Sequence, residues 1–355
     1  MADTQHTTTP ADIAFAQDSY KRLKGEIHKV IVGQDEVVDQ MLLAMFARGH
    51  ALVVGVPGLA KTLLISTIAR TLSLDFSRIQ FTPDLMPSDI TGTEVIEENR
   101  ATGHRELRFV QGPIFANVVL ADEINRTPPK TQAALLEAMQ ERQVTMGGMK
   151  HDLPKPFFVL ATQNPIEQEG TYPLPEAQLD RFMFQIRIAY PSLEEETEII
   201  RRASEKNAVQ LDAVLSAEDM DRVARMVEHH PVTEHVIAYA LRLVRATRIN
   251  EPMDNQVERP SLVREYLAWG AGPRASEYLV LAARAKALLN GDMLTTVDHV
   301  RSVAQPVLRH RILTNFNAEA DRITTDAIVE DLLTNTPVDG MGERDRRQVD
   351  AVMRS

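Results

Sequence analysis

Five short apolar runs alternate with helix-like segments over the first half of the chain. They are Ala51–Val54 and the stretches around Ser77–Phe81, Asn117–Ala121, Phe157–Thr162 and Met183–Ala189. Runs this rich in Val, Ile and Leu are typical of strands that are buried on both faces. The pattern therefore predicts an α/β fold in which helices cover both faces of a parallel sheet.

Helical spacing of apolar residues predicts the segments between the strands. Residues 13–49 read as helical with an interruption at Gly33, and the clearest later helix is Thr127–Gln143, for which we expect Thr127 as the N-cap. Two further segments read as hairpins. One pairs 93–96 with 106–110, and the other pairs 143–146 with 149–153 across two glycines.

The character of the chain changes after Pro191, because a charged helix follows and no strand pattern returns. This change predicts a second, all-α domain. The expected organisation is a disordered tail, an α/β core, a linker helix, an all-α domain and a charged C-terminal tail, at 1–12, 13–191, 192–210, 211–335 and 336–355.

Composition narrows the classes of function. The 355 residues are 44% hydrophobic, and 39 Lys and Arg stand against 50 Asp and Glu, so the net charge is −11. This charge disfavours a nucleic-acid coat protein, and the absence of cysteine excludes thiolate catalysis and disulfides. No apolar run is long enough to span a membrane, and the first residues lack a signal-peptide pattern, so we expect a cytoplasmic protein.

The most informative motif is the loop Gly55–Thr62, which lies between an apolar strand and a helix. Loop amides at a helix N-terminus can wrap a polyphosphate. Lys61 can reach the terminal phosphates, and the Thr62 hydroxyl can ligate Mg²⁺. The spacing G-x-x-x-x-G-K-[ST] is met except that Ala60 takes the place of the second glycine, so the loop alone could still be a tight turn.

Two further strand ends carry polar groups. Asp122 and Glu123 follow an apolar strand, so they should lie at the sheet edge where α/β proteins bind ligands. Asp122 can hold the magnesium shell. Since strand side chains alternate, Glu123 should point away from Asp122, where it can orient and activate the attacking water. Asn164 follows the strand at 157–162 and could hydrogen-bond the same water or the γ-phosphate, although Asn-Pro is also an ordinary turn signal.

These motifs and others, in order and without large gaps over residues 20–332, resemble the MoxR family of AAA+ ATPases. The residues that carry the resemblance are 32–34, 55–62, 87–92, 112–115, 122–126, 130–132, 135–142, 161–165, 176–182, 272–275 and 307–312. In that family the phosphate loop has the form Gly-Val-Pro-Gly-Leu-Ala-Lys-Thr, so Ala60 is no exception. The resemblance implies an AAA+ core followed by a helical lid.

The resemblance also assigns roles. ATP would be bound by the adenine segment and the phosphate-loop region, namely Val32, Gly33, Gln34, Val56, Pro57, Gly58, Leu59, Ala60, Lys61, Thr62, Leu63 and Asp122, with Mg²⁺ held by Thr62 and Asp122. Glu123, Lys61 and Asn164 would act in hydrolysis. Arg181 resembles the arginine finger given to a neighbouring subunit, and Arg274 resembles the second sensor arginine, acting in cis or in trans.

In such a protein, a ring, expected to be a hexamer, would use hydrolysis to remodel partner proteins. The family is associated with von Willebrand factor A domain partners. The two hairpins could line the pore or merely decorate the sheet edge. Alternatives are the ATPase subunit of a magnesium chelatase and a nucleotide-gated scaffold with little turnover; a DNA-remodelling role is disfavoured by the charge. The sequence gives no role for Arg309-His310-Arg311.

Overall fold

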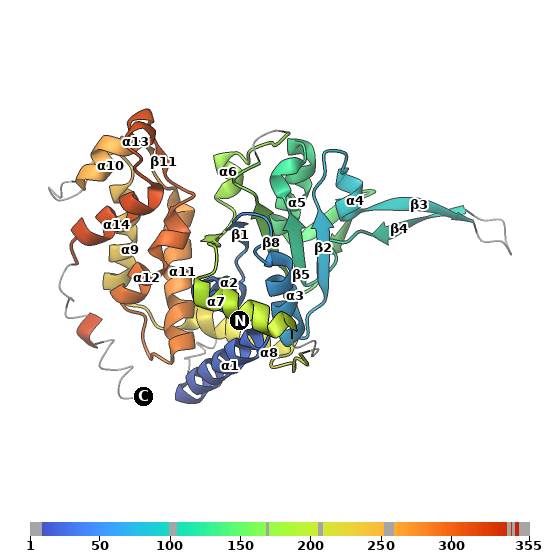
Figure 1. Cartoon of the computed structure of the whole chain (residues 1–355), viewed down its shortest axis with the longest axis horizontal. Helices are drawn as coiled ribbons and strands as arrows, with labels where there is room; N and C mark the ends of the chain where they lie inside the picture. Colours follow the sequence, from blue (N-terminus) through green and yellow to red (C-terminus); the bar gives the residue numbers. More distant parts are fainter. Residues whose placement is uncertain are drawn as a thin grey trace, which may run out of the picture.

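The sheet-containing core and a helical lid lie side by side, and one hairpin extends away from the core on the side opposite the lid (Figure 1). The structure is a computed structural model that describes residues 9–98, 105–167, 170–204, 209–251, 259–338, 342 and 345–347. Within these ranges no helix is long and apolar enough to cross a bilayer.

The central sheet is parallel and has the strand order β2-β5-β8-β1-β9. Its strands are β1 (Ala51–Val54), β2 (Phe76–Gln80), β5 (Val118–Asp122), β8 (Phe158–Gln163) and β9 (Phe184–Arg187). Each lies where the apolar pattern predicted a strand. Because all five run the same way, the loops that follow them meet at one edge of the sheet, the C-terminal edge, and the segments that precede them meet at the opposite, N-terminal edge.

Alternate residues of the strands bury against different layers of helices. On one face Val53, Leu120 and Leu160 join a core with α1 (Pro10–His28), α2 (Asp35–Phe46) and α3 (Lys61–Thr71). On the other face Leu52, Val119 and Val159 pack with α4 (Pro87–Thr91) and α5 (Pro129–Glu141). The predicted α/β fold, with helices on both faces of a parallel sheet, is confirmed.

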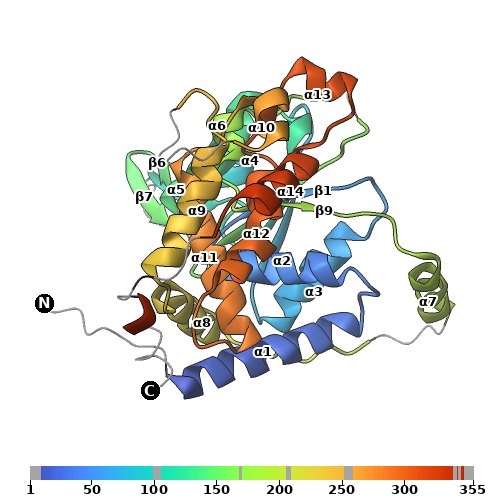
Figure 2. The same ribbon diagram turned by 90° about the vertical axis from the view of Figure 1, so that its left-hand side faces the viewer.

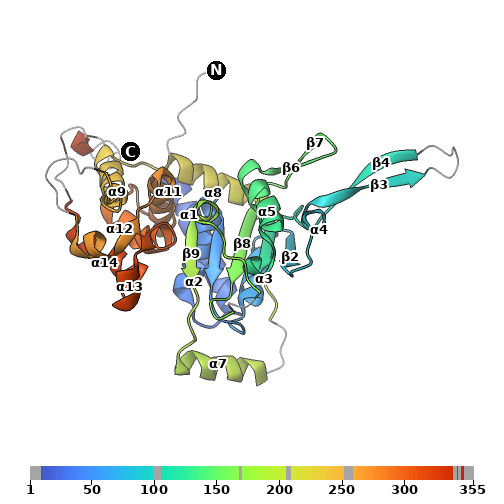
Figure 3. The same cartoon turned by 90° about the horizontal axis from the view of Figure 1, so that it is seen from above.

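Both predicted hairpins are present and lean on one another. They are formed by β3 (Gly92–Glu98) with β4 (Arg105–Gln111) and by β6 (Gln143–Met146) with β7 (Met149–Asp152). The rings of Phe109 and His151 stack with their centroids 4.1 Å apart, which joins the two hairpins. They project on the same side of the molecule (Figure 3).

The lid packs on the helical face of the core that holds α1 and α2. Its longest helix, α11 (Pro273–Asn290), contacts α1 and α2, and α12 (Val297–Leu308) contacts β9 (Figure 2). The buried residues of the lid therefore form one continuous core with that face of the sheet. The remaining helices between the core and the end of the lid are α6 (Glu176–Leu179), α7 (Leu193–Ser204), α8 (Ala217–His229), α9 (Glu234–Ala246), α10 (Ser261–Tyr266), α13 (Phe316–Ala320) and α14 (Thr325–Asn335).

Three details of the sequence prediction were wrong. The lid is helical but also contains a short antiparallel pair, β10 (Leu267–Trp269) with β11 (Leu313–Thr314), whose strands are too short to leave an alternating pattern. Helix α1 begins at Pro10, inside the predicted tail, because Thr9 and Asp12 form a capping box; residues 1–8 lie outside the described ranges. Thirdly, Thr127 is not the N-cap of α5: its hydroxyl donates to the Thr82 carbonyl (3.1 Å), and Pro128 is the N-cap.

Most of the predicted tail at 336–355 also lies outside the described ranges.

Candidate functional site

The phosphate-loop candidate spans the turn from β1 into α3 at the C-terminal edge of the sheet. Ala60 adopts a left-handed backbone with φ of 54°, the conformation that a glycine would adopt most easily. Gly58 is also left-handed, with φ of 85°. Ala60 thus takes the backbone conformation of the glycine it replaces, and α3 starts with its amides at the loop, where Lys61 and Thr62 are its first two residues.

The Lys61 ammonium lies against its own loop and near two carboxylates. It donates to the carbonyl oxygens of Gly55 (2.6 Å) and Val56 (3.3 Å). Burial lowers the pKa of Lys61, while the charges of Asp122 and Glu123 act to raise it. Both carboxylates therefore lie within electrostatic reach of the ammonium, so the loop and the end of β5 form one charged cluster.

A hydrogen-bonded network holds Asp122 and Glu123. Asp122 is largely buried and accepts from the Thr162 hydroxyl (2.7 Å) and from the guanidinium of Arg78 (2.6 Å). Gln80 donates to Glu123 at 2.9 Å, and Arg126 does so at 3.0 Å. Neither Arg78 nor Gln80 was predicted from the sequence to belong to this site. Their alternate positions on β2, beside β5, are the signal that could have found them.

The Glu123 side chain points away from that of Asp122 because of its backbone conformation, not because of strand alternation. Strand alternation was expected to turn its side chain away from that of Asp122, but β5 ends at Asp122 and Glu123 has a left-handed backbone with φ of 57°. Its amide donates to the Thr162 hydroxyl at 2.8 Å. This backbone turn separates the directions of the two carboxylates and costs about 1 kcal/mol or more for a residue with a side chain.

Asn164 is buried immediately after β8, beside the phosphate loop. The amide of Gly55 donates to the carbonyl of Gln163, the residue before it (3.3 Å). The side-chain oxygen of Asn164 accepts from the amide of Ile166 at 3.2 Å, so it stabilises its own Asn-Pro turn. The C-terminal edge thus holds the ends of β1, β5 and β8 together.

The adenine-segment candidate, Val32–Gln34, lies between α1 and α2. Gly33 is left-handed (φ 63°), and the Glu195 carboxylate packs so closely against it that a Cβ there would lie 1.7 Å from a carboxylate oxygen and displace that side chain. Gln34 is also left-handed and is the N-cap of α2. Its side-chain oxygen is buried without a hydrogen-bond partner in the described structure, which leaves an acceptor available for an amine donor such as that of adenine.

The two arginine candidates lie at the other edge of the sheet. Arg181 lies three residues before the start of β9, and the amide of Met183 donates to the carbonyl of His50, the residue before β1 (2.7 Å). Gly55 starts the phosphate loop at the far end of the same β1, which spans four residues or about 13 Å. Arg181 therefore lies at the N-terminal edge, one strand length away from the phosphate loop of its own chain.

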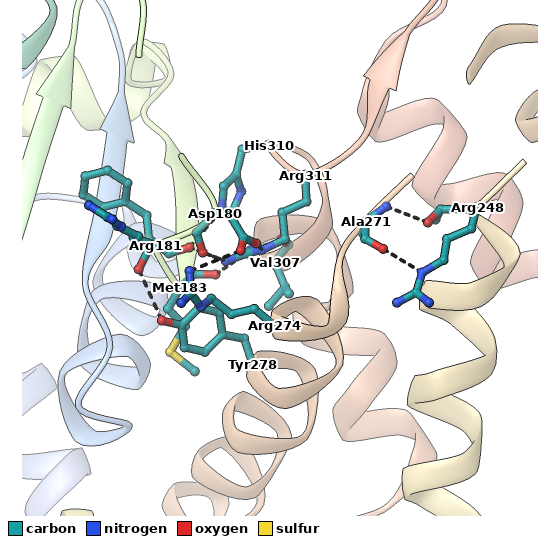
Figure 4. A network of polar contacts seen from close by, with 12 residues as sticks. Asp180, Arg181, Met183, Arg248, Ala271, Arg274, Tyr278, Val307, His310 and Arg311 are labelled. Carbon is teal, nitrogen blue, oxygen red and sulfur yellow. Dashed lines mark hydrogen bonds and ion pairs between the residues drawn. The ribbon is translucent and has the colours of Figure 1, made fainter. Parts of the chain in front are cut away.

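Arg274 shares that edge with Arg181, as the close view of the core and lid shows (Figure 4). Its guanidinium donates to Asp180 at 3.3 Å, and the Tyr278 hydroxyl donates to the carbonyl of Arg181 at 3.2 Å. Arg181 and Arg274 line one cavity of about 170 Å³, together with Arg48, His50, Met139, Gln140, Arg142 and Tyr278.

The cavity carries positive charge that is only partly compensated. Arg48 pairs with Asp221 and Glu228, while Arg142 and Arg181 have no carboxylate partner in the described part of the chain. Burial lowers the pKa of His50 to about 4, so this residue is neutral at pH 7. The lining is suited to an anion carrying several charges.

Comparison with known proteins identifies the family. A model of the ATPase family associated with various cellular activities matches residues 50–184, and a model of the AAA lid domain matches residues 259–332. The Chaperone MoxR1 of Mycobacterium tuberculosis is 46% identical over 87% of this chain and 79% of its own length. The chain belongs to the MoxR family of AAA+ ATPases.

Two other relatives agree with this assignment. Protein MoxR of Methylorubrum extorquens is 31% identical over 86% of this chain and 92% of its own length. A solved structure from Cytophaga hutchinsonii, described as a candidate ATPase, superposes with a TM-score of 0.82 at 41% identity, covering 92% of this chain and 97% of that one. The expectations of an AAA+ fold, MoxR membership and ATPase activity are confirmed.

Proposed function

We propose that this MoxR-family ATPase works as a ring in which each active site is built from two neighbouring subunits. One observation carries the proposal: Lys61, Asp122 and Glu123 lie at one edge of the sheet, and Arg181 and Arg274 at the other. A single nucleotide cannot meet both edges of its own chain. A neighbour that presents its N-terminal edge to the phosphate loop would complete the site, and a closed ring, most simply a hexamer, repeats this contact.

In this site the first subunit would bind the nucleotide and activate the attacking water. The amides of 56–63 and the Lys61 ammonium bind the phosphates, and the buried acceptor of Gln34 receives the adenine amine. Thr62 and Asp122 supply the hard oxygen atoms that Mg²⁺ prefers, and the substrate phosphates would complete its shell. Bound there, the ion would neutralise charge on the phosphates. Glu123 takes a proton from the attacking water, and Asn164 contacts the γ-phosphate.

The neighbour would supply the cations that stabilise the transition state. Arg181 has no carboxylate partner among the residues that the structure describes, so its charge is available to the γ-phosphate of the adjacent nucleotide. Arg274 lines the same cavity, which supports action in trans for this residue also. The cost of leaving two arginines so close together would be offset when a polyphosphate enters between them.

For the work done by hydrolysis, we propose chaperone-like remodelling of partner proteins, including one with a von Willebrand factor A domain. The name of the mycobacterial relative supports the chaperone class. The joined hairpins offer a contact surface, because Ile96 and Leu107 on the β3–β4 hairpin are 70% and 67% exposed. Such exposed apolar side chains on a projecting element favour contact with another polypeptide. We place this activity in the cytoplasm.

Subunit mixing tests the two-edge site. Arg181→Ala and Lys61→Ala should each lack turnover, while a mixture should regain part of it, because Lys61→Ala subunits present an intact finger to the intact phosphate loop of Arg181→Ala subunits. Mass measurement with ATP should find a ring. A monomer with full turnover, or mixtures that stay inactive although the subunits co-assemble, would contradict the proposal.

A further inference from the structure

Three consecutive polar residues that follow the last residue of α12 are buried at the boundary between lid and core. Arg309, His310 and Arg311 are only 7%, 6% and 6% exposed. Burying a guanidinium is strongly unfavourable unless carboxylates and carbonyls replace the hydrogen bonds it made to water. The hydrogen bonds and ion pairs that compensate for this burial therefore indicate the role of these residues.

Arg311 directs its guanidinium into the turn that carries Arg181. It donates to the Asp180 carboxylate (2.9 Å), and to the carbonyls of Asp180 (2.9 Å), Phe182 and Met183 (3.2 Å). The guanidinium carbon of Arg311 lies over the Tyr278 ring, 5.1 Å from its centre (Figure 4). Burial lowers the pKa of Arg311 to about 10, so it stays charged at neutral pH.

The lid binds all four carbonyls of this turn, residues 180–183, which we call the finger turn. Arg311 reaches three of them, Tyr278 donates to the fourth, that of Arg181, and His310 adds a second bond to the carbonyl of Phe182 (2.9 Å). The amides of the same turn donate instead to core carbonyls, those of Glu176, Gln178, Leu179 and His50. The backbone of the finger turn is thus clamped between lid and core.

We propose that Arg311 is a positioning residue for Arg181, through which the lid sets the place of the finger that a subunit offers to its neighbour. The inference rests on the proposed function of Arg181 in trans. A change in the angle between lid and core has to move these carbonyls or break their hydrogen bonds. Lid position in one subunit then controls hydrolysis in the next, not in the same subunit.

A purely structural role for Arg311 would give a different result. In that case its loss would weaken the folding of its own subunit and impair its own phosphate loop as much as its finger. Arg309 provides the matched control, since it lies on the same turn with similar burial but contacts Asp326 and the carbonyl of Gln185 rather than the finger turn.

The experiment uses the full chain with Arg311→Met, Arg311→Lys, Tyr278→Phe and Arg309→Lys. For each variant, ring mass, affinity for a fluorescent ATP analogue and turnover are measured, alone and mixed with Lys61→Ala subunits. We expect Arg311→Met to lose about 100-fold in kcat, Arg311→Lys about 10-fold and Tyr278→Phe about threefold, while nucleotide affinity stays within twofold. Arg309→Lys should lose thermal stability but keep kcat within about twofold.

Mixing decides between positioning and structure. Lys61→Ala subunits should restore turnover to the Arg311 variants, because they provide an undisturbed finger. Unchanged kcat in assembled Arg311→Met, or no rescue where the Arg181→Ala mixture is rescued, would overturn the inference. If the Arg181→Ala mixture also stays inactive, the proposed function fails, and the inference fails with it. Should Arg311→Met not fold, Tyr278→Phe, which removes a single oxygen atom, carries the same test.

Discussion

The two edges of the sheet are built in different ways. At the C-terminal edge, charged residues of both signs come from the core and neutralise one another locally, as in the network of Asp122, Arg78 and Gln80 with Glu123. At the N-terminal edge four arginines line one cavity, and the lid fixes the backbone of the finger turn. We infer that one edge is complete for binding within a chain, while the other is complete only with a neighbour's polyphosphate.

The largest effects should separate the two edges by what they change. Lys61→Ala removes the ammonium of the phosphate loop at the C-terminal edge, so nucleotide affinity should fall by about 100-fold or more. Arg181→Ala should leave affinity within about twofold but lower kcat by about 10³-fold, the range known for arginine fingers. Titration with a fluorescent nucleotide and a phosphate-release assay measure both. Equal losses of affinity in the two variants would erase the distinction between the edges.

Glu123→Gln, at the C-terminal edge, should lower the rate of hydrolysis without weakening nucleotide binding. The amide keeps the shape of the side chain but cannot accept the proton, so kcat should fall by about 10²- to 10³-fold. Nucleotide affinity should hold, since Lys61 and the loop amides are untouched. Single-turnover measurements check this, and undiminished turnover would remove Glu123 as the base.

Arg142→Ala sharpens the description of the arginine cavity. Its side chain lines the cavity with Arg181 and has no carboxylate partner in the described ranges, so an entering polyphosphate should meet it directly. We expect about a tenfold loss in kcat/KM, the size of one charge-assisted hydrogen bond. Arg70→Ala, an exposed arginine on α3 outside this cavity, is the control and should change little. Equal effects from both would point to a general charge effect.

An effect confined to acid pH concerns the stability of the N-terminal edge. His50 is neutral in the fold: Nδ1 accepts from the Val159 amide (3.0 Å), and Nε2 lies 3.2 Å from the carbonyl of Met139. Its folded pKa, about 4, is below the unfolded value of 6.5, so the unfolded chain binds more protons between these values. The contribution of His50 to the free energy of unfolding should be constant above pH 6.5. It should fall as the pH drops below 6.5, by on the order of 3 kcal/mol at pH 4.

Urea unfolding at several pH values tests this linkage. His50→Gln should reduce the slope between pH 6.5 and 4, whereas His229→Gln, at an exposed position, should leave it unchanged. Since His230 is also buried with a pKa lowered to about 4, part of the slope should remain in either variant. A slope that His50→Gln does not alter would mean that acid acts elsewhere than at this edge.

The site residues that were not predicted from the sequence, Arg78 and Arg142, both find their partners on other elements of the fold. Arg78 meets Asp122 across neighbouring strands, and Arg142 joins Arg181 only because α5 ends where β9 begins in space. Each is an ordinary arginine in its local sequence. Its neighbours are decided by strand order and helix packing, which no local pattern records.

The sequence by itself determined the strands of the core and the sheet edge at which the phosphate-loop candidate lies. Apolar periodicity located the strands, and the phosphate loop, Asp122 and Asn164 could be placed at one edge because every parallel strand ends on that side. Only the tertiary structure decided that Arg274 shares a cavity with Arg181, and that Arg311, 131 residues beyond Asp180, binds the finger turn. The reason is physical: periodicity reports what a segment buries, whereas the partner of a buried charge is fixed only when distant elements pack.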